Sequence, residues 1–167
     1  MRLGEVSPSS NVTPDWFERD LHHGPKLLTR DEFREKVFKR DNHKCDVCGM
    51  KADDAHHIVE RRLWDDGGYY LENGASVCEP CHLKCEQTLI SCDELRFLYG
   101  VKVIHLPEHL YAEVDAPYDK WGNPILPSGQ RMKGELMDDP SVQKVLEPVI
   151  HLFTNKVKYP RTYHLPW

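Results

Sequence analysis

Two cysteine pairs constrain this chain more than any other feature of its sequence. Cys45 and Cys48 form one C-x2-C pair, and Cys78 and Cys81 form a second. Each pair places two thiolates on a tight turn, which suits half of a tetrahedral four-cysteine zinc site. The 29 residues between the pairs, 49–77, exceed the usual gap of a zinc ribbon. We therefore expect a structural Zn²⁺ and, between the pairs, a folded β-hairpin that keeps its two ends together.

The setting of the cysteines favours metal binding over disulfides. The first residues contain no apolar run that could form a signal peptide, so we expect a cytoplasmic protein with reduced thiols. Redox-active pairs are the competing interpretation, but no thioredoxin-like βαβ pattern surrounds them. Two cysteines remain: Cys85 is either a substitute ligand one helical turn after Cys81 or a buried free thiol, and Cys92 is spare.

Local patterns predict an α+β fold. Thr29 and Glu32 form a capping box that opens a helix to about Arg40, and Ser91 and Glu94 form a second that opens a helix ending at Gly100. The other predicted elements are a helix from 14 to 21, strands 55–59 and 75–78, a helix over 80–89, a strand over 101–106, and a helix from 141 kinked at Pro148. Length fits about one domain. We divide it into an N-terminal helical segment (1–41), a core with the zinc site (42–92), and a C-terminal extension packed on the core (93–167).

Histidines gather inside the zinc frame. His56 and His57 lie on the first predicted strand, Asn73 ends the following loop, and His82 follows Cys81 directly. Neighbouring strand residues point to opposite sides, so His56 and His57 are expected to differ in role. Glu86, four residues after His82, projects from the same helical face. A metal nuclease needs a neutral imidazole to deprotonate water and ligands that hold a cation against the phosphate.

The motifs CDVCG, AHHI and ENGASVCEPCH, in this order over residues 42–92, resemble an HNH endonuclease of the ββα-metal (His-Me finger) type with a four-cysteine zinc ribbon. The resemblance implies that His57 is the general base, that Asn73 holds the loop which orients it, and that His56 and His82 bind the catalytic cation. Some relatives carry a further histidine where this chain has Glu86, so Glu86 is either a third ligand or a solvent-facing residue. Mg²⁺ or Mn²⁺ is the expected catalytic cation, with Ni²⁺ or Zn²⁺ as alternatives.

Substrate binding is less specifically marked. Arg61 and Arg62 follow the catalytic strand and either clamp phosphates or form a solvated pair, and Tyr69 and Tyr70 either stack on a nucleotide or pack in the core. Charge is uneven: residues 26–51 carry a net +3, residues 65–147 a net −8 and the last twenty +3, within an overall −5. A nucleic-acid partner is expected, DNA before RNA, with weak non-specific affinity. No transmembrane segment and no membrane partner is expected.

Two alternatives stay open. One is an RNA-cleaving nuclease, and the other is a non-catalytic zinc-ribbon module that binds nucleic acid or protein. The terminal sequence KYPRTYHLPW also resembles the opening of some ATP-dependent RNA ligase domains, which implies a functional link to a nucleic-acid ligase. The K-x-D-G motif of those ligases is absent, so the chain is not expected to be a ligase itself. A tail packed on the domain is the competing interpretation.

Overall fold

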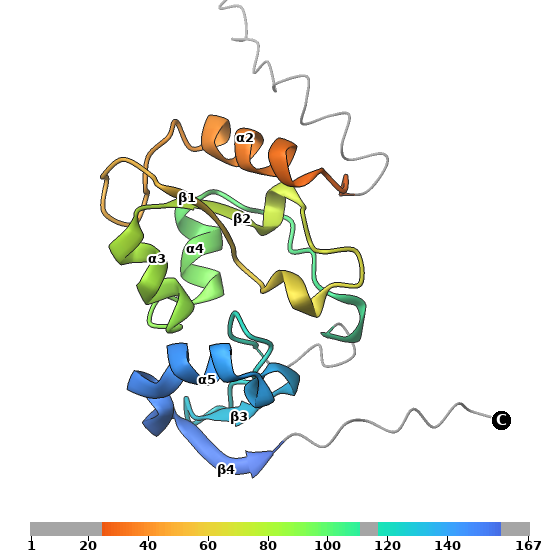
Figure 1. Ribbon diagram of the computed structural model, residues 1–167, viewed down its shortest axis with the longest axis vertical. Coiled ribbons are helices and arrows are strands. Elements are labelled where there is room, and N and C mark those ends of the chain that lie inside the picture. The colour runs from red at the N-terminus through yellow and green to blue at the C-terminus, as the bar shows by residue number, and fades with distance from the viewer. Residues whose placement is uncertain (1–24, 111–116, 158–167) are drawn as a thin grey trace, which may run out of the picture.

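A computed structural model of the protein describes residues 25–110 and 117–157. It combines helices and strands in an α+β arrangement (Figure 1). The predicted helix over 14–21 and the terminal sequence at 158–167 lie outside the described residues. Among the described helices, none has the length and apolar character needed to cross a membrane.

Helix α2 (Arg30–Arg40) forms as its sequence predicts. The Thr29 hydroxyl accepts from the backbone N–H of Glu32 (3.2 Å), and the Glu32 carboxylate accepts from the Thr29 N–H (2.8 Å), which confirms the first capping box. Phe33 and Val37 are buried against the hairpin. A Cβ on Gly74 would collide with both side chains, so glycine permits this close approach of the helix to the strand.

The predicted hairpin consists of two short antiparallel strands, β1 (Asp54–His57) and β2 (Gly74–Val77), with His57 opposite Gly74. Both begin one residue before the predicted bounds, and β1 ends two residues earlier than predicted. The ladder continues in another form: the N–H of Ile58 donates to the Asn73 carbonyl and that of Val59 donates to Asn73 Oδ1, each at 2.8 Å. The connection contains two 3-10 turns, Arg61–Leu63 and Leu71–Asn73.

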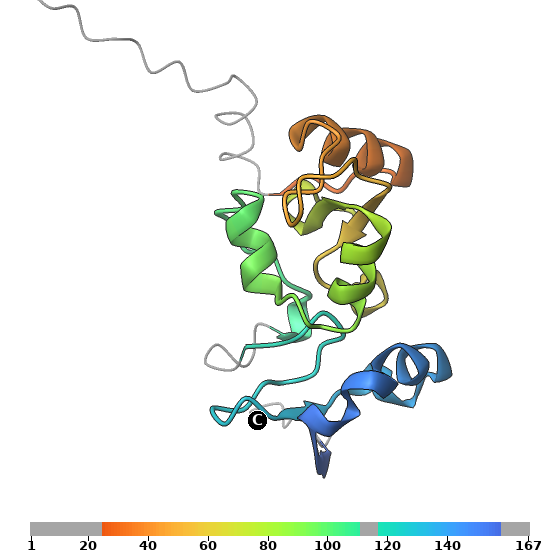
Figure 2. The ribbon, with the colours of Figure 1, turned by 90° about the vertical axis from the view of Figure 1, so that its left-hand side faces the viewer.

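Two helices follow the hairpin and cover it (Figure 2). Helix α3 (Glu79–Glu86) has Cys78 as its N-cap and ends before the predicted Leu89, since Thr88 adopts a positive φ of 62°. Helix α4 (Cys92–Leu98) opens with the predicted capping box of Ser91 and Glu94. The side chains between these elements form one core cluster: Cys45, Ile58, Ala75, Val77, Cys78, Cys81, Cys85, Cys92, Leu95 and Tyr99.

The C-terminal part differs more from expectation. The predicted strand over 101–106 is wrong: these residues are irregular, and Val103 and Ile104 are exposed without a partner strand. The strands that do form, β3 (Arg131–Lys133) and β4 (Phe153–Val157), pair in parallel. Between them α5 (Pro140–Leu146) packs Val142 and Leu146 into a separate core cluster, and a 3-10 turn (Glu147–Leu152) replaces the helix around Pro148.

Candidate functional site: a four-cysteine cluster beside a histidine and glutamate cluster

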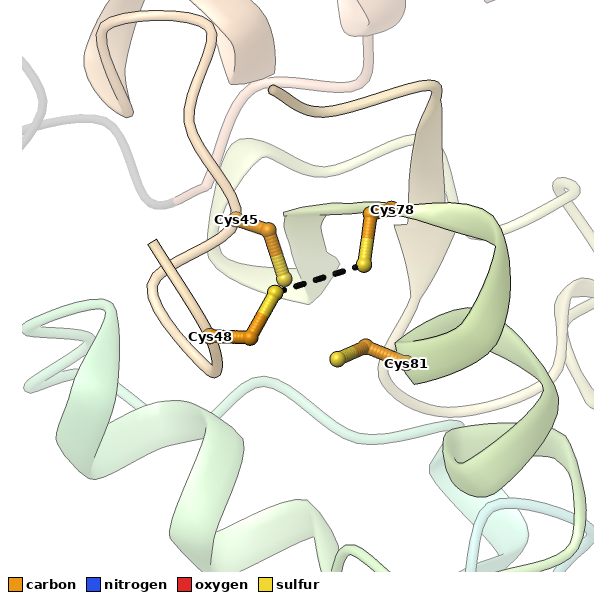
Figure 3. A group of neighbouring side chains, drawn as sticks. All are labelled: Cys45, Cys48, Cys78 and Cys81. Atoms are coloured by element: carbon orange, nitrogen blue, oxygen red, sulfur yellow. Dashed lines mark hydrogen bonds between the residues drawn. The ribbon is translucent and has the colours of Figure 1, made fainter. Parts of the chain in front are cut away.

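The four paired cysteines converge at one end of the hairpin (Figure 3). Their sulfur atoms all lie within 4.8 Å of one another, and Cys48 Sγ lies 3.4 Å from Cys78 Sγ. The first pair sits on a turn closed by a bond from the Gly49 N–H to the Cys45 carbonyl (2.6 Å), with Gly49 at φ +79°. The second pair sits at the start of α3. The four cysteines could therefore hold a structural metal such as zinc.

The electrostatic surroundings of these sulfurs fit a metal-bound thiolate cluster. Burial opposes ionisation of Cys45, but backbone N–H donors of Cys78, Cys48 and Val47 outweigh it and lower the Cys45 pKa to about 7. Burial and the neighbouring cysteines raise the pKa of Cys81. Ionisation of one thiol thus opposes ionisation of its neighbours. A divalent cation bound among the sulfurs would offset this repulsion between thiolates.

The spare cysteines stand apart from this cluster. Cys85 and Cys92 are buried free thiols, and neither belongs to the four-sulfur group. Burial raises the pKa of Cys85 to about 12 and that of Cys92 to about 11. Of the two interpretations of Cys85, the buried thiol is confirmed.

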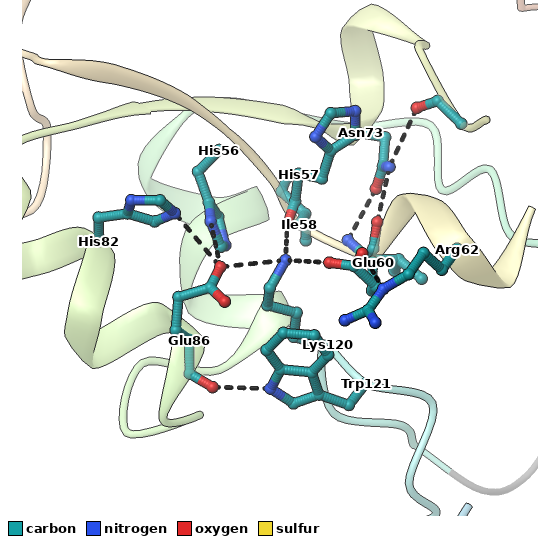
Figure 4. A network of polar contacts seen from close by, with 12 residues as sticks. His56, His57, Ile58, Glu60, Arg62, Asn73, His82, Glu86, Lys120 and Trp121 are labelled. Atoms are coloured by element: carbon teal, nitrogen blue, oxygen red, sulfur yellow. Dashed lines mark hydrogen bonds and ion pairs between the residues drawn. The ribbon is translucent and has the colours of Figure 1, made fainter. Parts of the chain in front are cut away.

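A second group of metal-ligating side chains comes from β1 and α3 (Figure 4). His56 comes from β1, and His82 and Glu86 come from successive turns of α3. Glu86 Oε1 lies 3.2 Å from His82 Nε2 and 3.4 Å from His56 Nδ1. The helical spacing therefore aims Glu86 at both histidines, and two imidazoles and a carboxylate form a donor set that suits a divalent cation.

His56 is the most enclosed member of the group. Its side chain is 1% exposed, and among the described residues its ring nitrogens have no polar contact closer than the 3.4 Å between Nδ1 and Glu86 Oε1. Burial, with Lys120 nearby, lowers the His56 pKa to about 3, so the ring is a neutral imidazole with a free lone pair. Burial raises the pKa of Glu86, but the two histidines lower it by more, so this pKa lies below its usual range. A buried neutral imidazole that faces a carboxylate is an arrangement that a divalent cation between the two would fit.

Asp54 is also part of this site, although no sequence motif marks it. Its Oδ2 lies 3.5 Å from His82 Nδ1, the ring nitrogen opposite Glu86. Arg34 from α2 donates to Asp54 Oδ1 (3.1 Å) and fixes that carboxylate. A carboxylate behind an imidazole sets its orientation and its tautomer. The position of Asp54, two residues before His56 on a strand, is the signal that pointed to the same face.

His57 faces away from this cluster, as strand alternation predicts (Figure 4). Its ring stacks on Phe33 at 4.5 Å between centroids and meets Tyr69 edge to face at 5.1 Å. Burial and Lys120 lower the His57 pKa to about 4, so the ring is neutral at pH 7. Its Nε2 is buried and makes no hydrogen bond within the described part of the chain.

Two residues that were not predicted, Lys120 and Trp121, reach the site from the C-terminal extension. Lys120 Nζ donates to the His57 carbonyl (3.0 Å) and contacts Glu60 (3.1 Å) and Glu86 (3.3 Å). The indole N–H of Trp121 donates to the Glu86 carbonyl (2.7 Å). No motif marks these residues, which follow Glu86 by more than thirty positions in an irregular, proline-rich segment.

The two predicted phosphate ligands differ in their surroundings. Arg62 forms ion pairs with Glu60 (3.0 Å) and Asp139 (2.7 Å), so its guanidinium already has two carboxylate partners. Arg61 is exposed, with one long contact of 3.3 Å to the Tyr69 hydroxyl. Tyr70 is buried, which favours its core interpretation, and Tyr69 is half-buried beside His57.

A scan against protein-family models, a search of curated proteins and a search of solved structures each return no match to this chain.

Proposed function

We propose that this protein is a metal-dependent endonuclease of the HNH type that hydrolyses phosphodiester bonds, in DNA before RNA. One observation carries the proposal. His56 and His82 both face Oε1 of Glu86, while His57, the next residue on the strand after His56, faces the other way as a neutral imidazole. Because adjacent strand residues point to opposite sides, His56 can bind a cation while His57 acts as a base.

In this proposal the residues divide the chemistry. His56, His82 and Glu86 hold a divalent cation, which when bound stabilises the charge that develops on the phosphate and the leaving oxygen. His57 accepts the proton of the attacking water, and its lowered pKa leaves it unprotonated for that task. Asn73 fixes the backbone after β1, and zinc on the four cysteines would hold together the start of β1 and the end of β2, at one end of the hairpin.

Nucleic acid would approach the site on the side where Arg61 is exposed. Arg61 lies three residues after Ile58, and its contact with Tyr69 sets it beside the His57 ring. An exposed guanidinium at that point suits a phosphate next to the scissile bond. Because a site of this kind does not select the sugar, an RNA substrate remains the closest variant of the same proposal.

One observation favours a second candidate, a zinc-dependent binding module without catalysis. His57 Nε2 is buried, and its ring packs against Phe33. In that case zinc would matter for folding, and His57 would contribute only its packing.

The test is incubation of zinc-loaded protein with plasmid, single-stranded DNA and RNA, each with Mg²⁺, Mn²⁺, Ni²⁺ or added Zn²⁺. His82→Ala, prepared in parallel, is the matched control for a contaminating nuclease. Cleavage by the wild type that His82→Ala and chelator both remove supports the proposal. Substrate binding without cleavage under every condition supports the binding module instead.

A further inference from the structure

Lys120 places a fixed positive charge against the candidate cation site. Its side chain is 5% exposed, and Nζ lies 3.3 Å from Glu86 Oε1. That oxygen is the one that faces His56 and His82. The carboxylate expected to bind the cation is therefore already shared with an ammonium group.

The loop around Lys120 is built to hold this geometry. Asp119 Oδ1 accepts from the backbone N–H groups of Trp121 (2.9 Å) and Asn123 (3.0 Å), which closes a tight turn. The Lys120 carbonyl accepts from the Glu60 N–H at 2.9 Å. Trp121 closes the other side, with its ring 4.9 Å from Nζ and its N–H on the Glu86 carbonyl. The ammonium group is therefore enclosed by the His57 carbonyl, two carboxylates and the Trp121 ring.

This proximity has an electrostatic consequence for any cation at the site. With metal–oxygen bonds of about 2.1 Å, a cation on Glu86 Oε1 would lie within about 5.5 Å of Nζ. Like charges at this separation repel strongly where water is excluded. Glu60, on the far side of Lys120, neutralises only part of that charge.

We propose that Lys120 weakens cation binding to the free protein and thereby makes the cation bind together with an anionic substrate. This inference rests on the proposed function, because a scissile phosphate beside the cation supplies the negative charge that offsets the repulsion. By reciprocity, the cation then strengthens substrate binding by the same factor. Lys120 is a positioning residue in this scheme, since it acts through Glu86 and the bound cation.

The experiment measures Mn²⁺ affinity directly, by electron paramagnetic resonance of free Mn²⁺, on zinc-loaded protein. Thiolates prefer softer ions, so the four-cysteine site does not compete for Mn²⁺. Four proteins are compared: wild type, Lys120→Met, Lys120→Arg, and Lys144→Met as a control on an exposed lysine of α5. Each is titrated alone and with a phosphorothioate oligonucleotide that resists cleavage.

We expect Lys120→Met to bind Mn²⁺ at least about tenfold more tightly than the wild type in the absence of oligonucleotide. Lys120→Arg and Lys144→Met should match the wild type, because both keep the charge beside Glu86. The oligonucleotide should tighten Mn²⁺ binding in the wild type and have a smaller effect in Lys120→Met. Unchanged or weaker Mn²⁺ affinity in a folded Lys120→Met would overturn the inference.

Two further comparisons keep the result interpretable. If Lys120→Met alone unfolds because Glu60 is left as an unpaired buried charge, the double variant Glu60→Gln/Lys120→Met removes the pair together and should show the same tighter binding. If the wild type cleaves its substrate but Lys120→Met and the wild type bind Mn²⁺ equally tightly, this inference alone is refuted. No Mn²⁺ uptake by any of the proteins, with or without oligonucleotide, would refute both this inference and the proposed cation site.

Discussion

Asn73 and Val59 bind each other in both directions: the Val59 N–H donates to Asn73 Oδ1 at 2.8 Å, and Asn73 Nδ2 donates to the Val59 carbonyl at 2.9 Å. Asn73 Nδ2 also reaches the Gly68 carbonyl at 3.2 Å. A single buried amide thus ties the segment after His57 to the loop that returns to β2. Only a side chain with both a donor and an acceptor can make these bonds.

Replacing this amide tests its structural role. Asn73→Asp should lower the free energy of unfolding by about 1–3 kcal/mol, because a carboxylate would face the Val59 and Gly68 carbonyls without a donor. Urea denaturation measures the change, with Asn155→Asp at an exposed position of β4 as the control. Equal stability of the two variants would show that the Asn73 bonds contribute nothing.

The four-cysteine cluster predicts a dependence of folding on metal. Cys78→Ser should lose bound zinc and unfold at a lower temperature, because binding energy at a structural zinc site is folding energy. Cys85→Ala, a buried cysteine outside the cluster, should keep its zinc. Metal analysis and a thermal melt measure both. Zinc loss from Cys85→Ala, or an unchanged melt of zinc-free wild type, would contradict this assignment.

Glu86 sets the expected cation preference. An oxygen ligand beside two imidazoles favours Mg²⁺ or Mn²⁺, so Glu86→His should shift the activity optimum toward Ni²⁺ or Zn²⁺. Cleavage is measured across the metal series for wild type, Glu86→His and Glu86→Ala. Three superimposable profiles would show that Glu86 does not touch the cation.

The two arginines should separate binding from stability. Arg61→Ala should weaken nucleic-acid binding and reduce its salt dependence by about one counterion, because Arg61 is exposed and carries no ion pair among the described residues. Arg62→Ala should mainly lower stability, since its partners are Glu60 and Asp139. Fluorescence anisotropy over a salt series and a thermal melt distinguish them. The reverse pattern would assign phosphate contact to Arg62.

The sequence predicted the features that depend on short-range patterns. Thr29 and Glu32 are three residues apart, and Cys45 and Cys48 likewise, so local geometry alone determines how each pair meets. The convergence of Glu86 on His82 follows in the same way from helical spacing. The alternation of His56 and His57 required only that their segment be a strand.

Features that depend on distant partners were not predictable. Residues 101–106 have strand-like composition, but a strand requires a neighbour, and no described segment pairs with them. The position of Lys120 in the site could not be predicted, because it depends on contacts with Glu60 and Glu86, which lie much earlier in the chain. The early end of β1 depends on the Asn73 side chain, which accepts from the Val59 N–H where a regular strand would use a backbone carbonyl.

The most direct test of the account is the rate of single-turnover cleavage by His57→Ala. The account predicts a loss of at least about a hundredfold, the usual contribution of a positioned general base, with zinc content, Mn²⁺ uptake and folding unchanged, because His57 lies outside both metal clusters. Cleavage at the wild-type rate by a folded, metal-loaded His57→Ala would contradict it and assign proton abstraction to another group.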